Sequence, residues 1–160
     1  MDIHAKDKAL EHYGRALEFV PRLVSEKQAA ALSAIYQKRG AAYLATGQFD
    51  EAIQDFTNLL HQGRSMDDRA RQHSALNALA EAYFYAHRLD ELDRCAGEAL
   101  RIAEDWGDER LRVETIAFIA MRQDIVGELA EAKRGLDEII RVARTLDYKR
   151  ALLDGLAWRG

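Results

Sequence analysis

The residues of this chain that could do chemistry are its histidines, its single cysteine and its carboxylates. Imidazole and thiolate groups hold zinc when they recur at short, regular spacing. The histidines stand at positions 4, 12, 61, 73 and 87, and Cys95 has no second cysteine to join it. Because no zinc spacing is present, the sequence predicts no metal site.

The densest group of carboxylates lies between residues 104 and 109. A calcium loop places its oxygen ligands at alternate positions, and this group lacks that alternation. We interpret its members as helix caps and solvated surface: Glu104, Asp105, Asp108 and Glu109. The chain also has no Gly-rich phosphate loop, nucleophile elbow or paired-acid motif. The sequence therefore predicts a protein that is not an enzyme and needs no cofactor.

The composition is that of a single helical domain. Of its 160 residues, 48% are apolar and 31% are charged, which is enough to bury a core and argues against disorder. One proline among many Ala, Leu, Glu and Arg residues favours helix. A net charge of −4 offers no basic surface for nucleic acid. The start of the chain has no signal peptide, no apolar run reaches the length of a membrane span, and the cysteine is alone. We therefore expect a cytoplasmic protein with no nucleic-acid or membrane partner.

An internal repeat of forty residues organises this domain. Small residues recur at positions 40, 80, 120 and 160, and apolar residues within each half recur at the three- and four-residue steps of amphipathic helices. The register gives full repeats at about 33–66, 73–106 and 113–146, between partial repeats at 1–25 and 147–160. The predicted helices span 6–20, 27–45, 49–63, 68–86, 89–105, 109–126, 129–145 and 148–159.

The connectors between these helices also repeat. Gly47, His87 and Gly127 stand where the first helix of each repeat must end in a left-handed turn, which glycine adopts without strain and histidine tolerates. An apolar residue followed by an aspartate recurs forty residues apart, and we expect these pairs to staple and cap the next helix. The connectors are Met66-Asp67-Asp68, Trp106-Gly107-Asp108 and Leu146-Asp147-Tyr148.

The first full repeat resembles the signature of the tetratricopeptide family, and the forty-residue period resembles its long-repeat subclass. The motif reads Gly40-x-x-Tyr43-x-x-x-Gly47-x-Phe49-x-x-Ala52-x-x-x-Phe56. The resemblance covers nearly the whole chain. It implies an all-α fold, a right-handed superhelical solenoid of antiparallel helix hairpins, and an interaction scaffold for a protein or peptide that lies in the concave groove.

The family's groove positions can be carried over to the first helix of each repeat. They are Ala34, Gln37, Ala41, Leu44, Ser74, Asn77, Glu81, Phe84, Tyr85, Glu114, Ala117, Phe118, Met121 and Asp124. Among them, the residues that we expect to bind a ligand are Gln37, Leu44, Asn77, Glu81, Phe84, Tyr85, Phe118, Met121 and Asp124. The Lys/Asn/Arg clamp of chaperone-binding members and the backbone-binding asparagines of cell-polarity adaptors are both missing, so neither ligand class is implied.

The aromatic run Tyr83-Phe84-Tyr85 allows two interpretations. Tyr83 belongs to the core by register, whereas Phe84 and Tyr85 face the groove and either anchor a ligand or complete the stack of first helices. Burying one such side chain yields about 1.5–3 kcal/mol. Because micromolar binding needs about 8 kcal/mol, polar neighbours such as Asn77 and Glu81 must contribute.

The two ends of the chain suggest other interpretations. The chain begins inside a second helix and stops inside a first helix, which we expect of a segment of a longer protein or of ends that pair between copies. Self-association would then use the residues of the terminal helix, namely Leu152, Leu156 and Trp158. The remaining alternative is a sensory or regulatory segment of a bacterial signalling protein, such as a transcription activator or a nucleotide cyclase.

Overall fold

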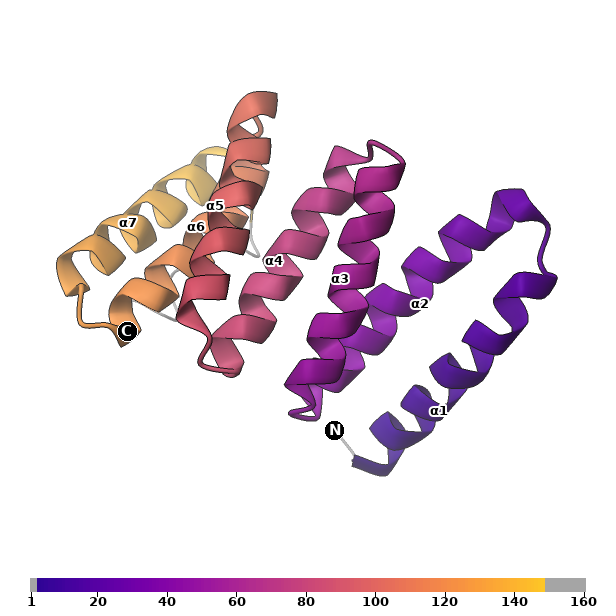
Figure 1. The fold of residues 1–160 in the computed structure, drawn as a ribbon. Coiled ribbons are helices and arrows are strands. Elements are labelled where there is room, and N and C mark those ends of the chain that lie inside the picture. Colours follow the sequence, from indigo (N-terminus) through magenta and orange to yellow (C-terminus); the bar gives the residue numbers. More distant parts are fainter. Residues whose placement is uncertain (1–2, 149–160) are drawn as a thin grey trace.

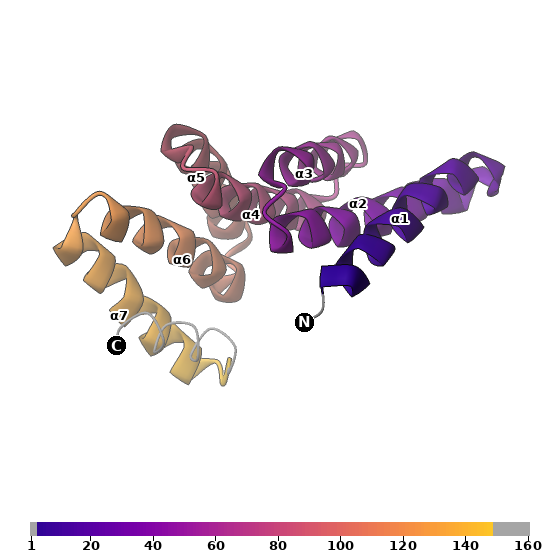
Figure 2. The same ribbon diagram turned by 90° about the horizontal axis from the view of Figure 1, so that it is seen from below.

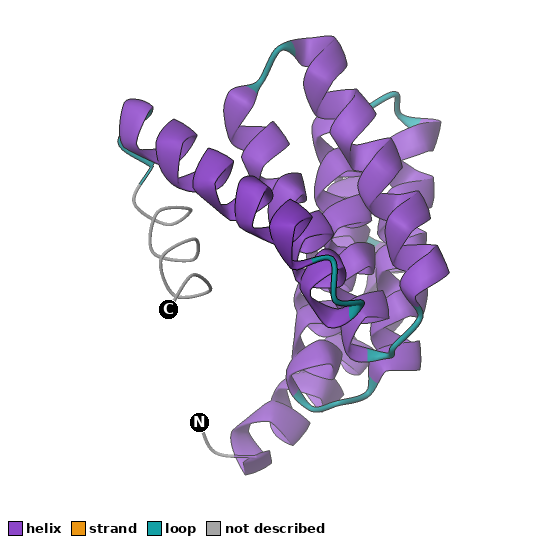
Figure 3. Ribbon diagram, turned by 90° about the vertical axis from the view of Figure 1, so that its left-hand side faces the viewer, coloured by secondary structure: helices purple, strands orange, loops and turns teal. Residues whose placement is uncertain are grey.

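The structure is a computed structural model that describes residues 3–148, and this part of the chain is helical with no strand (Figures 1 and 3). Its elements are α1 (Ile3–Phe19), the 3₁₀ helix η1 (Val20–Arg22), α2 (Ser25–Ala45), α3 (Phe49–Ser65), α4 (Arg69–Tyr85), α5 (Leu89–Trp106), α6 (Glu109–Ile125) and α7 (Leu129–Thr145). The all-α prediction is confirmed. The helix predicted at 148–159 lies outside the described residues, except for its first residue.

From the end of α2 onward, the turns after the helices recur every twenty residues. Each of these turns has one residue with positive φ, and these residues are Gly47, Asp67, His87, Gly107, Gly127 and Asp147. After each of them, the next backbone N–H returns to a carbonyl five residues earlier, as in Gln48 to Tyr43 at 2.9 Å and Arg88 to Tyr83 at 2.9 Å. This bond closes the C-terminus of each helix. The left-handed conformation predicted at Gly47, His87 and Gly127 is therefore confirmed, and it sets helices of nearly equal length.

The aspartates in the connectors divide between two roles. Asp68 caps α4 by accepting a hydrogen bond from the backbone of Arg71 at 2.9 Å. Asp108 caps α6 by accepting from Arg110 at 2.9 Å and from Leu111 at 3.1 Å. Asp67 and Asp147 hold the left-handed position, which short polar side chains tolerate. The expectation that a connector aspartate caps the next helix is therefore confirmed at Asp68 and Asp108, whereas Asp67 is not the capping residue of α4.

The helices pack in pairs that follow the chain, and α4 also packs against α6. In Figure 2, α3 and α5 lie on one side of α4, and the row of helices bends toward the other side at α6 and α7. Helices α2, α4 and α6, which we term the first helices, therefore form one layer. None of the helices in the described part has the length and apolar character that crossing a membrane requires.

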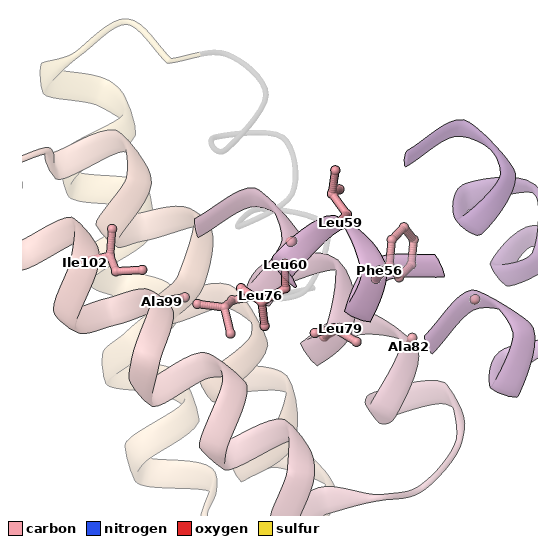
Figure 4. Close-up of a cluster of buried hydrophobic side chains, with 10 residues drawn as sticks. Phe56, Leu59, Leu60, Leu76, Leu79, Ala82, Ala99 and Ile102 are labelled. Carbon is pink, nitrogen blue, oxygen red and sulfur yellow. The ribbon is translucent and has the colours of Figure 1, made fainter. Parts of the chain in front are cut away.

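The core follows the seams between consecutive helices. Its largest cluster draws on α3, α4 and α5 and includes Phe56, Leu60, Leu76 and Leu79 (Figure 4). Gly40 is buried against this cluster, and a Cβ built on it would lie 2.6 Å from the Phe56 ring. A small residue is therefore required at position 40, as the repeat predicts.

Candidate binding site

The first helices enclose a cavity of about 620 Å³. It is lined by residues of α2, α4 and α6, by Phe56 of α3, by two residues of α7 and by Tyr148, which follows α7. Seven of the nine residues predicted to bind a ligand line it: Gln37, Leu44, Asn77, Glu81, Tyr85, Phe118 and Met121. A volume of this size is typical of ligand pockets.

Phe84 does not line the cavity. Its ring is half-buried and packs against Ala80, Leu92 and Ala96 at the seam between α4 and α5. The physical reason is that Ala96 stands where the preceding repeat has Phe56, so a second ring is needed to fill the space. The interpretation that Phe84 completes the stack is the one that this packing favours.

Asp124 also lies away from the cavity lining. Its side chain is exposed near the end of α6, and its carbonyl oxygen accepts the N–H of Gly127 at 3.1 Å in the turn that follows. Leu44 occupies the equivalent position of the first repeat and reaches the cavity, whereas the shorter, charged Asp124 is turned to solvent.

Tyr85 remains the aromatic group that α4 presents to the cavity. It is 46% exposed and stacks on Phe49 with ring centroids 6.0 Å apart. Phe84 meets it edge-on at 5.4 Å. Offset and edge-on pairs stabilise aromatic side chains beyond their burial, so the Tyr85 ring has a fixed position while one side of it stays accessible.

A buried network of polar side chains joins α4 to α6 beside the cavity. His73 Nε2 lies 3.1 Å from the carbonyl of Leu111 and 3.0 Å from Thr115 Oγ1. The Thr115 hydroxyl donates to Asn77 Oδ1 at 3.0 Å. Because a carbonyl only accepts, Nε2 carries the proton of the neutral imidazole. Burial lowers the pKa of His73, and the carboxylates of Glu114 and Asp108 oppose this effect.

Among the described residues, the charged side chains that line the cavity are Glu81 from α4 and Glu114 from α6. Glu114 accepts a hydrogen bond from the Tyr148 hydroxyl. The guanidinium of Arg110 lies 5.7 Å from the centre of the Tyr148 ring. The cavity therefore combines two carboxylates with aromatic and aliphatic walls.

The sequence did not predict every part of this cavity. Tyr148 was expected only as a connector, since it stands in register with the capping residues Asp68 and Asp108. Its ring instead packs on the cluster formed by α6 and α7 and reaches the cavity. Leu136 and Ile139 of α7 line the cavity as well. An aromatic residue at a capping position is the signal that could have identified Tyr148.

A smaller cavity of about 270 Å³ lies at the seam between α3, α4 and α5 and is lined by Tyr83 and Cys95. Burial raises the pKa of the Cys95 thiol to about 11, so the thiol stays protonated at neutral pH. Cys95 packs against the apolar clusters on either side of it. Within residues 3–148, no group of three or more metal-ligating side chains comes together.

The exposed connector residues and the chain end complete the survey of predicted sites. Trp106 is 47% exposed and Met66 is 52% exposed, so these two side chains are not buried staples. The self-association residues Leu152, Leu156 and Trp158 lie outside the described residues.

In comparison with known proteins, no family model matches this chain, and no curated protein matches its sequence.

Proposed function

We propose that this chain is a solenoid of tetratricopeptide type that binds a protein or peptide segment in the cavity between its first helices. The observation that supports the proposal most is the convergence of seven groove residues on one cavity, since they were chosen by register alone. The proposal includes a non-catalytic role in the cytoplasm, supported by the absence of catalytic motifs and of a second cysteine in the sequence.

The shape and chemistry of the cavity support a peptide ligand. Tyr85, Phe118 and Met121 offer the aromatic and thioether surface that anchors an inserted side chain. Gln37 and Asn77 add amide groups that can bond to a peptide backbone. These groups come from three successive first helices, which suits an extended or helical segment laid across them.

A random-peptide selection tests this proposal. A displayed library of peptides of about twelve residues is selected on the wild-type chain. The affinity of each enriched peptide is then measured for wild type and for Ala41→Trp. Ala41 lines the cavity on α2 and is exposed, so the tryptophan blocks the cavity without disturbing the core. We expect Ala41→Trp to weaken binding at least about tenfold, because it displaces the anchoring side chains.

The matched control is Ala70→Trp, which makes the same change at an exposed position of α4 outside the cavity lining. Its affinity should stay within about twofold of wild type. Enriched peptides that bind both variants as tightly as wild type would contradict the proposal, and so would a selection that enriches no peptide.

A further inference from the structure

The amide of Asn77 connects the buried polar network to the cavity. Asn77 lines the cavity on α4, although the residue is only 8% exposed. The other members of the network, Thr115 and His73, are 0% and 1% exposed and do not belong to the lining. Asn77 is therefore the member of the network that a ligand in the cavity can touch.

The hydrogen bonds of this network run in one direction. The imidazole N–H of His73 donates to the carbonyl of Leu111, which can only accept. The Thr115 hydroxyl has a single proton and two possible acceptors. The Leu111 carbonyl lies at 3.3 Å and already receives the imidazole, whereas Asn77 Oδ1 lies at 3.0 Å. The hydroxyl therefore donates to Asn77.

This bond fixes which end of the Asn77 amide faces the cavity. Because Oδ1 accepts from Thr115, the amide nitrogen with its two N–H donors points away from that hydroxyl. Among residues 3–148, no acceptor pairs with Nδ2, and Arg122 Nε is the buried side-chain nitrogen or oxygen without a partner. Nδ2 is therefore accessible from the cavity that Asn77 lines. A ligand that displaces water from Nδ2 must supply an acceptor in its place.

The first repeat does not hold its equivalent amide in this way. Gln37 stands forty residues before Asn77 and is exposed. The Ser33 hydroxyl bonds toward α3 and not toward α4. Ala75 of α4 has no hydroxyl at the position that Thr115 has on α6. Of the two amides in the lining, the one on α4 is thus the one with a fixed orientation.

The chemistry of the lining favours a neutral acceptor for this donor. Among the described residues, the lining contains no lysine or arginine, the side chains that pair most strongly with a carboxylate. A carboxylate ligand would also meet the like charge of Glu114. A peptide carbonyl is neutral, and every residue of a bound segment carries one.

We propose that Asn77 donates a hydrogen bond to one backbone carbonyl of the bound peptide and so sets the register in which the peptide lies. Thr115 and His73 are positioning residues, which hold the amide with its N–H groups toward the ligand. This inference rests on the proposed function, since it names the residue of the same cavity that reads the peptide backbone.

The test is a thioamide scan of a peptide enriched by the selection on the wild-type chain. Each backbone carbonyl is replaced in turn by a thiocarbonyl, which is a weaker acceptor, and affinity is measured by fluorescence polarisation. We expect one position to lose about fivefold in affinity on wild type and to lose nothing further on Asn77→Ala. The variant itself should bind the unmodified peptide about five- to tenfold more weakly. Its fold is retained, because the Thr115 hydroxyl can turn to the Leu111 carbonyl, and thermal melting verifies this.

A second pair of variants tests the positioning role. Thr115→Val replaces the hydroxyl by a methyl group of the same shape, and His73 keeps its bond to Leu111. The Asn77 amide is then free to turn over, so binding should weaken by about threefold. Thr115→Ser returns the hydroxyl and should restore the affinity. The matched control is Gln37→Ala, which removes the exposed amide of the first repeat and should change affinity by less than about twofold.

Four results would overturn the proposal while Ala41→Trp still blocks binding. They are a scan with no sensitive carbonyl, a sensitive position that remains sensitive on Asn77→Ala, wild-type affinity in Thr115→Val, and equal weakening by Gln37→Ala. If the affinity depends instead on an Asp, Glu or terminal carboxylate of the peptide and this dependence vanishes in Asn77→Ala, the acceptor is a carboxylate and the backbone assignment is wrong. Binding that survives Ala41→Trp would reject the cavity itself.

Discussion

The hairpins α2–α3 and α4–α5 have the same helix and turn arrangement, but different side chains pack between their helices. In the first, Arg39 makes a two-bonded ion pair with the buried Asp55 at 2.6 and 2.7 Å. Forty residues later, the equivalent positions hold Leu79 and Cys95, and both pack in the apolar cluster. Burial raises the pKa of this thiol to about 11, whereas the Asp55 hydrogen bond raises the pKa of Arg39.

The seam beside these pairs differs as well. The first hairpin sets Gly40 against the Phe56 ring, and the second sets Ala80 near Ala96. In the second hairpin, Phe84 and Phe118 both pack on the cluster that contains Ala80 and Ala96. The comparison teaches that the turns every twenty residues set the positions of the helices. The size of the side chains packed between the helices then decides which other side chains are free to line the cavity.

We expect the largest effect on stability from a substitution that breaks the ion pair of the first hairpin. Asp55→Ala leaves Arg39 without its partner at a partly buried position, and we expect a loss of about 3 kcal/mol in the free energy of unfolding. Urea denaturation measures it. Asp50→Ala serves as the control, because its pair with Arg88 is exposed and should contribute less than about 1 kcal/mol.

The two hairpins can also be compared by giving the first hairpin the apolar side chains that the second has at the equivalent positions. The double variant Arg39→Leu/Asp55→Cys places an apolar pair in the first hairpin, and it should lie within about 1 kcal/mol of wild type. If this variant is as unstable as Asp55→Ala, then the helix arrangement does not accept both an ion pair and an apolar pair at these positions.

The adjacent rings of the second hairpin should separate packing from binding. Phe84→Ala opens the seam between α4 and α5 and should cost about 2 kcal/mol, since the ring is half-buried. Tyr85→Ala should cost about 1 kcal/mol or less, because Tyr85 is 46% exposed and loses mainly its stacking on Phe49. Peptide affinity should fall in Tyr85→Ala more than in Phe84→Ala, and the reverse order would contradict this division.

The close approach in the first hairpin predicts opposite outcomes for two glycines. Gly40→Ala forces a Cβ against the Phe56 ring and should destabilise by about 1–2 kcal/mol, even with the better helix propensity of alanine. Gly97→Ala meets nothing within 4 Å in α5 and should stabilise by about 0.5–1 kcal/mol. Chemical denaturation of both variants checks the signs, and a stabilised Gly40→Ala would show that the seam yields.

The smallest effect concerns pH and a position where the two hairpins also differ. Ser33 bonds to Gln62 of α3 at 2.7 Å, whereas its equivalent, His73, bonds toward α6. Burial lowers the pKa of His73 below its unfolded value. The unfolded state therefore takes up the proton first, and stability present above about pH 6.5 is lost as the pH falls. His73→Gln should flatten this decline relative to wild type, while substitution of the exposed His61 by Gln should leave it unchanged.

The sequence predicted the elements better than the contents of the cavity. Gly47 and Gly127 revealed the turns because left-handed backbone favours glycine, and helical register brought Asn77 and Phe118 to the cavity. The fate of Phe84 depended on the size of Ala96, a residue of another helix. The bond from His73 to Thr115 spans two repeats. Such contacts depend on packing between helices, and the periodicity of a single helix carries no information about that packing.

The most direct test of the binding cavity is amide chemical-shift mapping of the isotope-labelled chain during titration with the tightest peptide from the wild-type selection. We predict that the largest changes fall on the lining of α2, α4 and α6, around Gln37, Asn77, Glu81 and Phe118. Changes centred instead on the smaller cavity near Tyr83 and Cys95, or on the exposed turn at Ile125 and Leu129, would contradict the account.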